Sequence, residues 1–449
     1  MRLDGKQVVV IGLGASGVAA ARVLLDEGAR VRVTESRPRA EVADAAGRAG
    51  SAGAEVLAGG HEAAHLDGAE LVVTSPGVPE QAEVIRWAQE RRLPVWSELE
   101  LGARLARCPY IGITGTNGKT TTTEMVAAAM REAGLDALAC GNIGHPFSLA
   151  AGEGHQALAV EASSFQLRFH ESFHPRVSVL LNLAPDHLDW HRSLHDYRES
   201  KRRIYALQSD GDTHVGNRDD PHAAGVSGDA PCAVAWFTLD APREGEVGYE
   251  GGELVTRLGP PHRLGPLSTE TLSLRTDAAA AAAAAIAFGI DPESVGSAMA
   301  SFSPLPHRGT VVAEAGGVRF VDDSKASNPH AALAALEGLE GAVLVAGGRS
   351  KGIDLSPLAA ATPRLAGVVA IGEAAGELAA LFEGRVPVRL ADSMEDAVAD
   401  AYALASPGAT VVLAPACASW DMFRDYGERG DRFAVAARAL AERAEVRRA

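Results

Sequence analysis

Short apolar runs recur along this chain, and each of them ends in a polar or glycine-rich turn. In the first hundred residues stretches of helical character separate the runs, which cover 7–11, 30–34, 55–57, 70–74 and 93–96. A second block includes runs at 110–113, 157–160 and 177–182, and a third has runs at 318–321, 342–346, 368–371, 386–390 and 410–413. Strands that alternate with helices form parallel sheets, so the sequence predicts an α/β fold.

A chain of 449 residues is too long for one ordinary core, because domains commonly hold ~100 to 200 residues. We expect three domains, over residues 1–98, 99–306 and 307–449: a Rossmann-like domain, a P-loop ATPase-like domain with a mostly parallel sheet, and a second Rossmann-like domain. Dense glycine and proline between 211 and 266 predict small β-hairpins at the surface. The alanine run 278–285 predicts a helix with Asp277 as its N-cap, because alanine is the best helix former.

The charge balance excludes some classes of partner. Acidic residues number 58 and basic residues 42, a formal charge of -16, so general affinity for nucleic acid or an anionic membrane would oppose the protein's own field. The first apolar run is too short for a signal peptide or a membrane helix. Four scattered cysteines without a CxxC pair suit a reducing compartment. We therefore expect a cytoplasmic protein that binds neither nucleic acid nor membrane.

A glycine-rich turn follows the first predicted strand. Residues 12–17 read GLGASG and open a helix, and Glu35 ends the next strand. Glycines at this position let the backbone approach a diphosphate, and a carboxylate can bind ribose hydroxyls. The pattern fits NAD, FAD and other nucleotide diphosphates equally well, and a purely structural tight turn is the alternative. A rigid loop at 74–79 follows another strand at the same predicted sheet edge.

The strand at 111–113 leads into a second glycine turn, of sequence TGTNGKTT, and then into a helix. This is a P-loop, whose backbone N–H groups bind phosphates while Lys119 reaches the β and γ oxygens and Thr120 holds Mg²⁺. The strict motif would require glycine where Ile113 stands, so the loop is a narrower variant, and a turn without a ligand is the alternative. The residues expected to grip the phosphates are Gly115, Thr116, Asn117, Gly118, Lys119, Thr120 and Thr121.

Polar segments follow two later strands of this block, at the edge where open α/β sheets place their sites. Glu161 is a natural Mg²⁺ ligand beside Thr120, because Mg²⁺ prefers hard oxygen ligands. The histidines His187, His191 and His195 have the spacing of a zinc-binding helix face, although surface histidines are the more common reading of such a pattern.

Two strand-end loops of the third block contain a lysine. Lys325 follows the run 318–321, and Lys351 lies in the glycine loop after 342–346. A third such loop begins at 414 and contains Ser419. A hydroxyl, helix N-terminal N–H groups and lysine together suit a small carboxylate. Arg308, between the second and third blocks, is placed either to reach phosphate charge or as part of a linker.

Three segments, in this order, resemble the Mur ligase family. They are the P-loop GTNGKT at 115–120, EASSFQL at 161–167, and the stretch that runs from PACAS at 415–419 to the pair Arg429-Gly430. The first segment is common to the family, whereas the other two resemble the branch that adds D-glutamate. The resemblance covers nearly the whole chain.

The resemblance implies ATP-dependent ligation of D-glutamate to the nucleotide sugar UDP-N-acetylmuramoyl-L-alanine in peptidoglycan synthesis. The alanyl carboxylate would attack the γ-phosphate, with Lys119 and Lys325 stabilising the transferring group, and the D-glutamate amine would then displace phosphate from the acyl phosphate. His187 would assist metal placement or proton transfer. Both substrates are small molecules and no NAD is required. We expect the enzyme to be a monomer.

The resemblance also assigns residues to ligands. UDP-sugar contacts would come from Gly14, Ser16, Glu35, Ser36, Ser75 and Gly77, with Asn142 and Gln166 near the reacting carboxylate. ATP contacts would come from the P-loop together with Arg308, Asp323 and Lys325. Two Mg²⁺ ions would be held by Thr120, Glu161, His187 and a Lys201 carbamylated by CO₂, although residue type alone makes Lys201 a solvated helix lysine. D-glutamate would contact Ser327, Lys351, Ser419 and Tyr426.

The sequence departs from the family pattern in three segments. The His-Asn-x-x-Asn start of a helix that usually contacts adenine appears here as Thr276-Asp277-Ala278-Ala279-Ala280, which leaves the adenine contact open. Arg349 stands where an acidic residue is common, and Ser327 replaces threonine. Three alternatives to the implied function also stay open: a dehydrogenase built on the first glycine turn, a P-loop protein without ligase activity, and a ligase for another amino acid such as L-glutamate.

Overall fold

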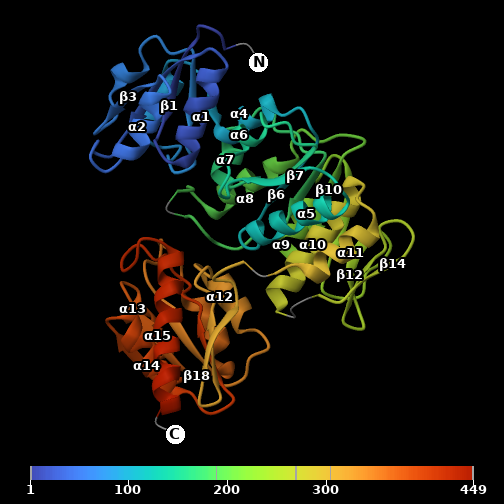
Figure 1. The fold of residues 1–449 in the computed structure, drawn as a ribbon, viewed down its shortest axis with the longest axis vertical. Helices are drawn as coiled ribbons and strands as arrows, with labels where there is room; N and C mark the ends of the chain where they lie inside the picture. Colours follow the sequence, from blue (N-terminus) through green and yellow to red (C-terminus); the bar gives the residue numbers. More distant parts are fainter. Residues whose placement is uncertain (1–2, 189, 268–270, 304, 447–449) are drawn as a thin grey trace. The chain divides into compact units, whose positions relative to one another are not determined.

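The computed structural model describes residues 3–188, 190–267, 271–303 and 305–446, and Figure 1 shows the course of the chain. By its internal contacts the chain divides into two compact units. The first comprises Met1–Leu183, Trp190–Ser268 and Thr276–Phe302. The second comprises Ala184–Asp189, Thr269–Arg275 and Ser303–Ala449, so that two short segments from earlier in the sequence belong with the C-terminal part.

The first sheet has five parallel strands in the order β3-β2-β1-β4-β5. They are β1 (Gln7–Ile11), β2 (Arg30–Glu35), β3 (Glu55–Ala58), β4 (Leu71–Thr74) and β5 (Val95–Ser97), connected by α1 (Ala15–Asp26), α2 (Ala43–Ser51), the 3-10 helix η1 (Ala63–Leu66) and α3 (Glu83–Glu90). Val8 and Val10 pack into one apolar cluster and Val9 and Ile11 into another, as expected of a strand buried on both faces. The strand order reverses between β1 and β4, where sheets of this kind bind ligands.

The second sheet, also in the first unit, has nine strands in the order β14-β13-β12-β11-β10-β9-β6-β8-β7. Its strands are β6 (Tyr110–Thr114), β7 (Ala137–Gly141), β8 (Ala157–Glu161), β9 (Val177–Leu180), β10 (Thr213–Asn217), β11 (Ala233–Phe237), β12 (Glu246–Glu250), β13 (Glu253–Thr256) and β14 (His262–Gly265). Antiparallel hairpins join β12, β13 and β14, and the other pairs are parallel. The hairpins expected between 211 and 266 are thus present, but they continue the central sheet, and β10 and β11 are parallel members of it.

Several helices belong to this region of the chain. They are α4 (Glu98–Leu105), α5 (Lys119–Glu132), α6 (Phe147–Ala150), α7 (Ser164–Arg168), α8 (Leu194–Arg202), the 3-10 helix η2 (Arg203–Tyr205), α9 (Pro221–Ser227), α10 (Leu272–Phe288) and α11 (Pro292–Ser301). The alanine run 278–285 is a buried part of α10, as its composition predicts. The expectation that Asp277 caps this helix is wrong, because α10 begins at Leu272 and Asp277 is buried within it.

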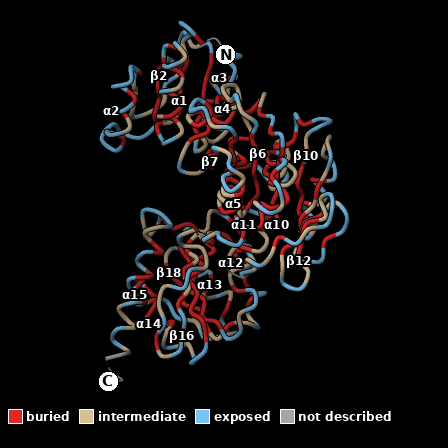
Figure 2. Tube along the Cα trace, turned by 45° about the vertical axis from the view of Figure 1, so that its right-hand side comes forward, coloured by how far each residue is buried: buried red, intermediate tan, exposed pale blue. Residues whose placement is uncertain are grey.

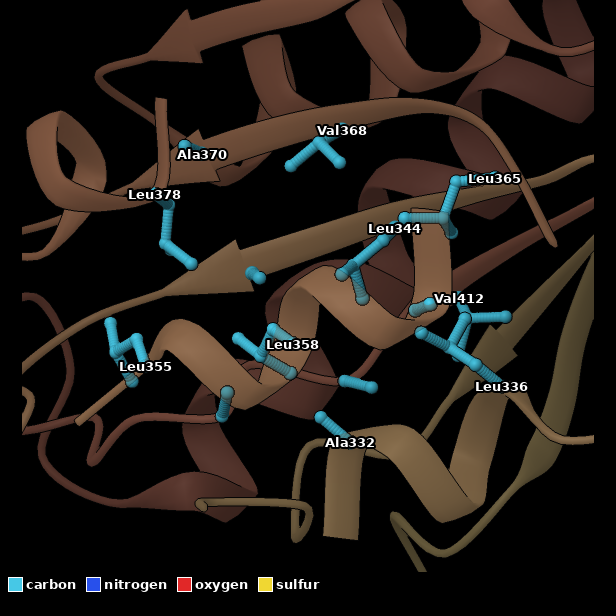
Figure 3. Packing of buried hydrophobic residues seen from close by; sticks show 14 of the residues in the cluster. Ala332, Leu336, Leu344, Leu355, Leu358, Leu365, Val368, Ala370, Leu378 and Val412 are labelled. Carbon is cyan, nitrogen blue, oxygen red and sulfur yellow. The ribbon is translucent and has the colours of Figure 1, made fainter. Parts of the chain in front are cut away.

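The second unit contains a six-stranded sheet of order β15-β16-β20-β17-β18-β19, in which only the pair β15–β16 is antiparallel. Its strands are β15 (Thr310–Ala315), β16 (Val318–Asp322), β17 (Ala342–Gly347), β18 (Leu365–Ile371), β19 (Val388–Ala391) and β20 (Thr410–Leu413). Its helices are α12 (Pro329–Leu336), the 3-10 helix η3 (Ser356–Arg364), α13 (Ala375–Phe382), α14 (Met394–Leu404) and α15 (Tyr426–Val446). Figure 3 shows one of its cores, where Leu336, Leu344 and Val412 belong to one apolar cluster.

Most strands of both units are buried, apart from edge strands such as β3, β15 and β19, and many of the connecting turns are exposed (Figure 2). Three separate, mostly parallel sheets confirm the predicted α/β class. The domain limits at 98/99 and 306/307 remain a prediction. Among the described residues, no helix combines the length and the apolar composition that crossing a bilayer requires.

Candidate active site

The turn after β1 is held by a buried carboxylate. Glu35 accepts hydrogen bonds from the backbone N–H of Leu13 at 2.7 Å and from the Arg37 guanidinium at 2.9 and 3.1 Å. Burial by itself raises the pKa of Glu35, but the hydrogen bonds from Arg37 and Leu13 outweigh burial and lower the pKa to about 2. The Ser75 hydroxyl, after β4, donates to the carbonyl of Gly12 at 3.2 Å. The two predicted loops therefore meet at one edge of the sheet, and Glu35 is ionised there.

The other residues predicted for the nucleotide sugar fall into two groups. The first group lies in the loops and at the helix start of the same sheet edge, exposed or half-buried: Gly14, Ser16, Ser36 and Gly77. Gly14 is the N-cap of α1, and no side chain of this residue accepts from the first N–H groups of the helix. A helix start that binds an anion needs such N–H groups without a capping side chain. The second group follows two strands of the central sheet. Asn142 comes directly after β7 and donates to Glu161, whereas Gln166 is fully buried and forms a capping box with Ser163 at the start of α7.

The P-loop joins β6 to α5, and its lysine is folded back onto the loop. Gly118, the N-cap of α5, adopts a left-handed backbone conformation with a φ of 84°. Lys119 Nζ donates to the carbonyl of Gly115 at 2.9 Å and to that of Thr116 at 2.8 Å. A helix start with glycine as its N-cap and an adjacent ammonium group are suited to bind phosphate oxygens.

Glu161 connects the P-loop helix to the loop after β7. Its two carboxylate oxygens accept hydrogen bonds from the Thr120 hydroxyl at 2.7 Å and from Asn142 Nδ2 at 2.9 Å. Glu161 is buried at the end of β8, which pairs with β6 in parallel. The parallel pairing therefore brings this carboxylate beside the first turn of α5, as its strand-end position predicts.

Lys201 on α8 is buried against the P-loop. Its Nζ donates to the carbonyl of Gly115 at 2.6 Å and lies 4.7 Å from the centroid of the Tyr197 ring. Tyr197 in turn shares a hydrogen bond of 2.9 Å with the hydroxyl of Thr116. With 2% of its surface exposed, Lys201 is not a solvated helix lysine, so the interpretation from residue type alone is wrong.

The histidine spacing does not produce a metal-binding helix face. Because α8 begins only at Leu194, His187 and His191 precede the helix, and His195 is exposed. His191 is not a surface residue: its Nε2 lies 2.9 Å from Ser164 Oγ, and burial lowers its pKa to about 4. Among the described residues, no three or more His, Cys, Asp or Glu side chains gather closely enough to hold a metal ion.

In the second unit, the residues predicted for ATP lie around the end of β16. Asp323 and Lys325 follow this strand, and Arg308 precedes β15. Burial raises the pKa of Asp323 to about 7, with Arg308 opposing the rise and Asp322 adding to it. Lys325 Nζ lies 3.6 Å from the centroid of the Tyr426 ring, so a residue predicted to meet ATP touches one predicted to meet D-glutamate.

Lys351 has a left-handed backbone, with a φ of 54°, which is uncommon for a residue other than glycine. Its Nζ lies 3.4 Å from Asp186 Oδ1, and Asn328 Nδ2 donates to Asp186 Oδ2 at 3.1 Å. Asp186 belongs to the segment Ala184–Asp189 that packs with the second unit. Ser419 is buried and Ser327 is half-buried in the neighbouring strand-end loops.

Four residues that had no predicted role help to build these loops: Arg37, Asn182, Asp186 and Arg429. Asn182 binds the P-loop backbone. Arg429 is almost fully buried and donates to the carbonyls of Cys417 and Ser324 at 3.0 and 2.7 Å. The contact of Arg37 with Glu35 could have been predicted, because two opposite charges stand two residues apart in the sequence. The tertiary contacts of Asn182 leave no local pattern in the sequence, whereas Arg429 stands at the end of one of the segments on which the family resemblance rests.

The P-loop lies at the strand ends of a mostly parallel sheet, and the second unit has lysines and hydroxyls at the strand ends of a Rossmann-like sheet. These features define a multidomain nucleotide-binding enzyme of the α/β class. Three family profiles match the chain in order: "Mur ligase MurD-like, N-terminal domain" at 6–97, "Mur ligase middle domain" at 113–247 and "Mur ligase, glutamate ligase domain" at 307–417. The chain belongs to the Mur ligase family.

Curated relatives extend over nearly the whole chain. The UDP-N-acetylmuramoylalanine--D-glutamate ligase of Frankia casuarinae is 44% identical, over 97% of this chain and 94% of the relative. The ligase of the same name from Pelotomaculum thermopropionicum is 40% identical, over 95% of this chain and 96% of the relative. These relatives confirm the resemblance seen in the sequence motifs.

Solved structures share the fold at lower identity. A pseudomurein peptide ligase type C from Methanothermus fervidus has a TM-score of 0.62 at 20% identity, covering 96% of this chain and 99% of that chain. The MurF ligase from Thermotoga maritima in complex with ADP has a TM-score of 0.60 at 17% identity, covering 94% of this chain and 96% of that chain.

Proposed function

We propose that this chain adds D-glutamate to UDP-N-acetylmuramoyl-L-alanine in peptidoglycan synthesis, using ATP to activate the alanyl carboxylate as an acyl phosphate. The observation that carries the proposal is the P-loop whose Thr120 contacts Glu161, in a chain 44% identical to a ligase named for this reaction. We expect the enzyme to act as a monomer in the cytoplasm, with small molecules as its substrates.

ATP would bind at the P-loop formed by Gly115, Thr116, Asn117, Gly118, Lys119, Thr120 and Thr121. The ammonium of Lys119 rests on two neutral carbonyls, those of Gly115 and Thr116. Charged phosphate oxygens are stronger acceptors than carbonyls, so a triphosphate would draw the ammonium toward its β and γ oxygens. Arg308, Asp323 and Lys325 are the further residues we propose as nucleotide ligands.

Thr120 and Glu161 fit a Mg²⁺ ion. Their oxygens lie 2.7 Å apart, and a hydroxyl and a carboxylate are the hard donors that Mg²⁺ prefers. Since Mg²⁺ commonly keeps several waters and shares phosphate oxygens, a complete cage of protein ligands is not needed. When bound, the ion would neutralise charge on the transferring phosphoryl group. We propose two such ions, with His187 and Lys201 as the remaining ligands.

Lys201 would serve as a ligand in its carbamylated form. The neutral amine adds CO₂ and releases a proton, which replaces an ammonium with an anion that carries two oxygens. If Lys201 is unmodified, its buried ammonium requires hydrogen-bond acceptors. The carbonyl of Gly115, which Lys119 also contacts, accepts from Lys201 Nζ at 2.6 Å. Its burial at the phosphate loop supports a chemical role rather than a solubilising one.

D-glutamate would be received by Ser327, Lys351, Ser419 and Tyr426. Lys351 is 3.4 Å from Asp186, and an incoming carboxylate would offer its ammonium a second anionic partner. At the first sheet, the UDP-sugar would bind through Gly14, Ser16, Glu35, Ser36, Ser75 and Gly77, with Arg37 as an added cation. Asn142 and Gln166 would lie near the carboxylate that becomes the acyl phosphate.

Phosphate release tests the proposal directly. The enzyme is supplied with ATP, Mg²⁺ and UDP-N-acetylmuramoyl-L-alanine, and D-glutamate, L-glutamate or lysine is added in turn. We expect release only with D-glutamate. Phosphate release with L-glutamate alone would show that L-glutamate is the acceptor. Phosphate release that does not depend on any added amino acid would exclude ligase activity.

A second experiment tests Lys201. We expect Lys201→Ala to lose most activity and to regain part of it with added short carboxylic acids, whose oxygens can replace those of the carbamate. Lys6→Ala is the matched control, because Lys6 lies in an exposed ion pair with Glu70. Full activity of Lys201→Ala would exclude the ligand role.

A further inference from the structure

We infer that Asn182 is a positioning residue of the nucleotide site, which fixes the first half of the P-loop next to the helix start that would bind phosphate. The inference rests on the proposed use of ATP. Asn182 is buried just beyond the end of β9, the strand that pairs with β6 and therefore ends beside the P-loop.

The Asn182 side chain binds the loop in both hydrogen-bonding directions. Its Oδ1 accepts from the backbone N–H of Thr116 at 3.1 Å and from that of Asn117 at 2.8 Å. Its Nδ2 donates to the carbonyl of Asn117 at 3.1 Å. The Asn182 main-chain carbonyl also accepts from Thr116 N at 3.1 Å. Only a carboxamide can accept and donate in this way at this size.

These bonds hold the first half of the P-loop in place. The N–H groups of Thr116 and Asn117 point toward Asn182, so they are committed to the protein. Gly118 follows them, and its left-handed backbone turns the chain into the first turn of α5. Holding the first half of the loop therefore fixes where the start of α5, with Lys119 and Thr120, would meet the phosphates.

The backbone of the loop lies directly on the strand end. A Cβ placed on Gly115 would come within 2.7 Å of Leu181 Cβ and 3.4 Å of Asn182 N, so this close approach requires glycine. A loop that is ordered before its ligand arrives loses less conformational entropy when the ligand binds. Asn182 thus acts on nucleotide affinity through the loop, without touching the nucleotide itself.

Nucleotide affinity of two variants tests this role. Asn182→Ala removes all side-chain bonds to the loop, and Asn182→Asp keeps the size and the acceptors but replaces the donor that faces the Asn117 carbonyl. We expect both variants of the full chain to bind ADP roughly tenfold or more weakly by calorimetry, as lost positioning bonds to a buried site predict. UDP binding should stay within about twofold, because the first sheet does not depend on these bonds.

Asn217 provides a matched control. It is a buried asparagine at the end of the neighbouring strand β10, and its side chain binds the Leu181 carbonyl at 2.7 Å and Asp219 N at 2.9 Å. Asn217→Ala should lower the melting temperature but leave ADP affinity within about twofold. Hydrogen exchange of the peptide that contains Thr116 and Asn117 should accelerate only in the Asn182 variants.

The outcomes separate this inference from the proposed function. Wild-type ADP affinity in Asn182→Ala, or an equal loss in Asn217→Ala, would overturn the positioning role. Where Asn182→Ala does not fold, the isosteric Asn182→Asp decides the question. A wild-type enzyme that binds ADP but releases no phosphate with D-glutamate would refute the proposed function. The ADP affinities of the Asn182 variants would then still decide whether Asn182 positions the loop.

Discussion

Lys325 Nζ lies 3.6 Å from the centroid of the Tyr426 ring, so the loop after β16 is tied to the first residue of α15. Tyr426 is 40% exposed, so the ammonium rests on an aromatic face that solvent can partly reach. Cation–π contacts contribute ~0.5–1 kcal/mol at exposed sites and about 2 kcal/mol when desolvated. Because the proposed ligands of these two residues are ATP and D-glutamate, the contact links the placement of one ligand to that of the other.

Removing the ring should therefore affect the use of ATP. We expect Tyr426→Leu to lower kcat/KM for ATP roughly threefold to thirtyfold, the range that such a contact energy implies. Tyr426→Phe keeps the aromatic face and should stay within about twofold. Steady-state phosphate release at varied ATP measures both variants. Equal values for the leucine and phenylalanine variants would show that the ring does not position Lys325.

Gly118 should not tolerate a side chain. A Cβ there would lie 2.1 Å from Asp277 Oδ1, and the φ of 84° is unfavourable for any other residue. We expect Gly118→Ala to abolish measurable ADP binding. Gly134 is the matched control, because its φ is 82° and a Cβ on it would meet nothing within 4 Å. Gly134→Ala should cost about 1 kcal/mol of stability and leave ADP binding intact. Retained binding in Gly118→Ala would place the phosphates elsewhere.

The sequence predicted those parts of the fold that follow from local pattern. All five strands of the first sheet are at the expected runs, because short apolar runs stand out from the polar and glycine-rich turns around them, even in β3 and β5, which are mostly half-buried. The strand β15 was missed, since it is an edge strand whose residues are mostly exposed or half-buried. The predicted start of α10 was wrong because the prediction rested on the alanine run, whereas the helix begins earlier, at Leu272.

The candidate site was predictable where a motif carries its own chemistry. The P-loop and Glu161 come together as expected, because parallel strands end at one edge. Burial of Lys201 could not be read from its neighbours in the sequence, since α8 has a largely polar composition and the decisive partner is the Gly115 carbonyl. Asn182 was missed for the same reason: its role depends on pairing between β6 and β9.

An ion pair connects the loop after β4 with the last residue of α7. Arg168 binds both carboxylate oxygens of Glu80, at 2.8 and 2.9 Å, and the next residue, Phe169, packs on an apolar cluster of the first sheet. A bidentate pair of this kind fixes geometry as well as charge. We infer that it holds the loop that contains Ser75 and Gly77 in place for the UDP-sugar.

Charge reversal tests this pair. We expect Glu80→Arg and Arg168→Glu each to raise KM for UDP-N-acetylmuramoyl-L-alanine roughly threefold to tenfold, because like charges then face each other. The double reversal should recover most of the loss. Arg263→Glu is the control, since its pair with Glu253 is exposed on the outer hairpin. A double variant as impaired as either single one would show that the contact does not position the loop.

Asp323 should give the stability of the chain a pH dependence of predictable sign. Burial raises the pKa of Asp323 from an ordinary 3.8 to about 7, so the folded state holds this proton more tightly than the unfolded state. The stability that the protonated carboxyl contributes is fully present below 3.8 and is lost as the pH rises toward 7. Asp323→Asn resembles the protonated form at every pH. The free energy of unfolding of Asp323→Asn, relative to wild type, should therefore increase between pH 4 and pH 7 and stay constant above.

Urea denaturation of both proteins at several pH values measures this difference without nucleotide. Asp354→Asn is the control of opposite sign, because hydrogen bonds from Ser356 lower the pKa of Asp354. The contribution of Asp354 is present above its ordinary pKa and lost only at lower pH, so its variant should differ from wild type by a constant amount between pH 4 and pH 7. A constant difference for Asp323→Asn as well would mean that its carboxyl is ionised throughout this range. Asp323 would then meet the nucleotide as a carboxylate at every physiological pH, and its burial would have to be offset by Arg308.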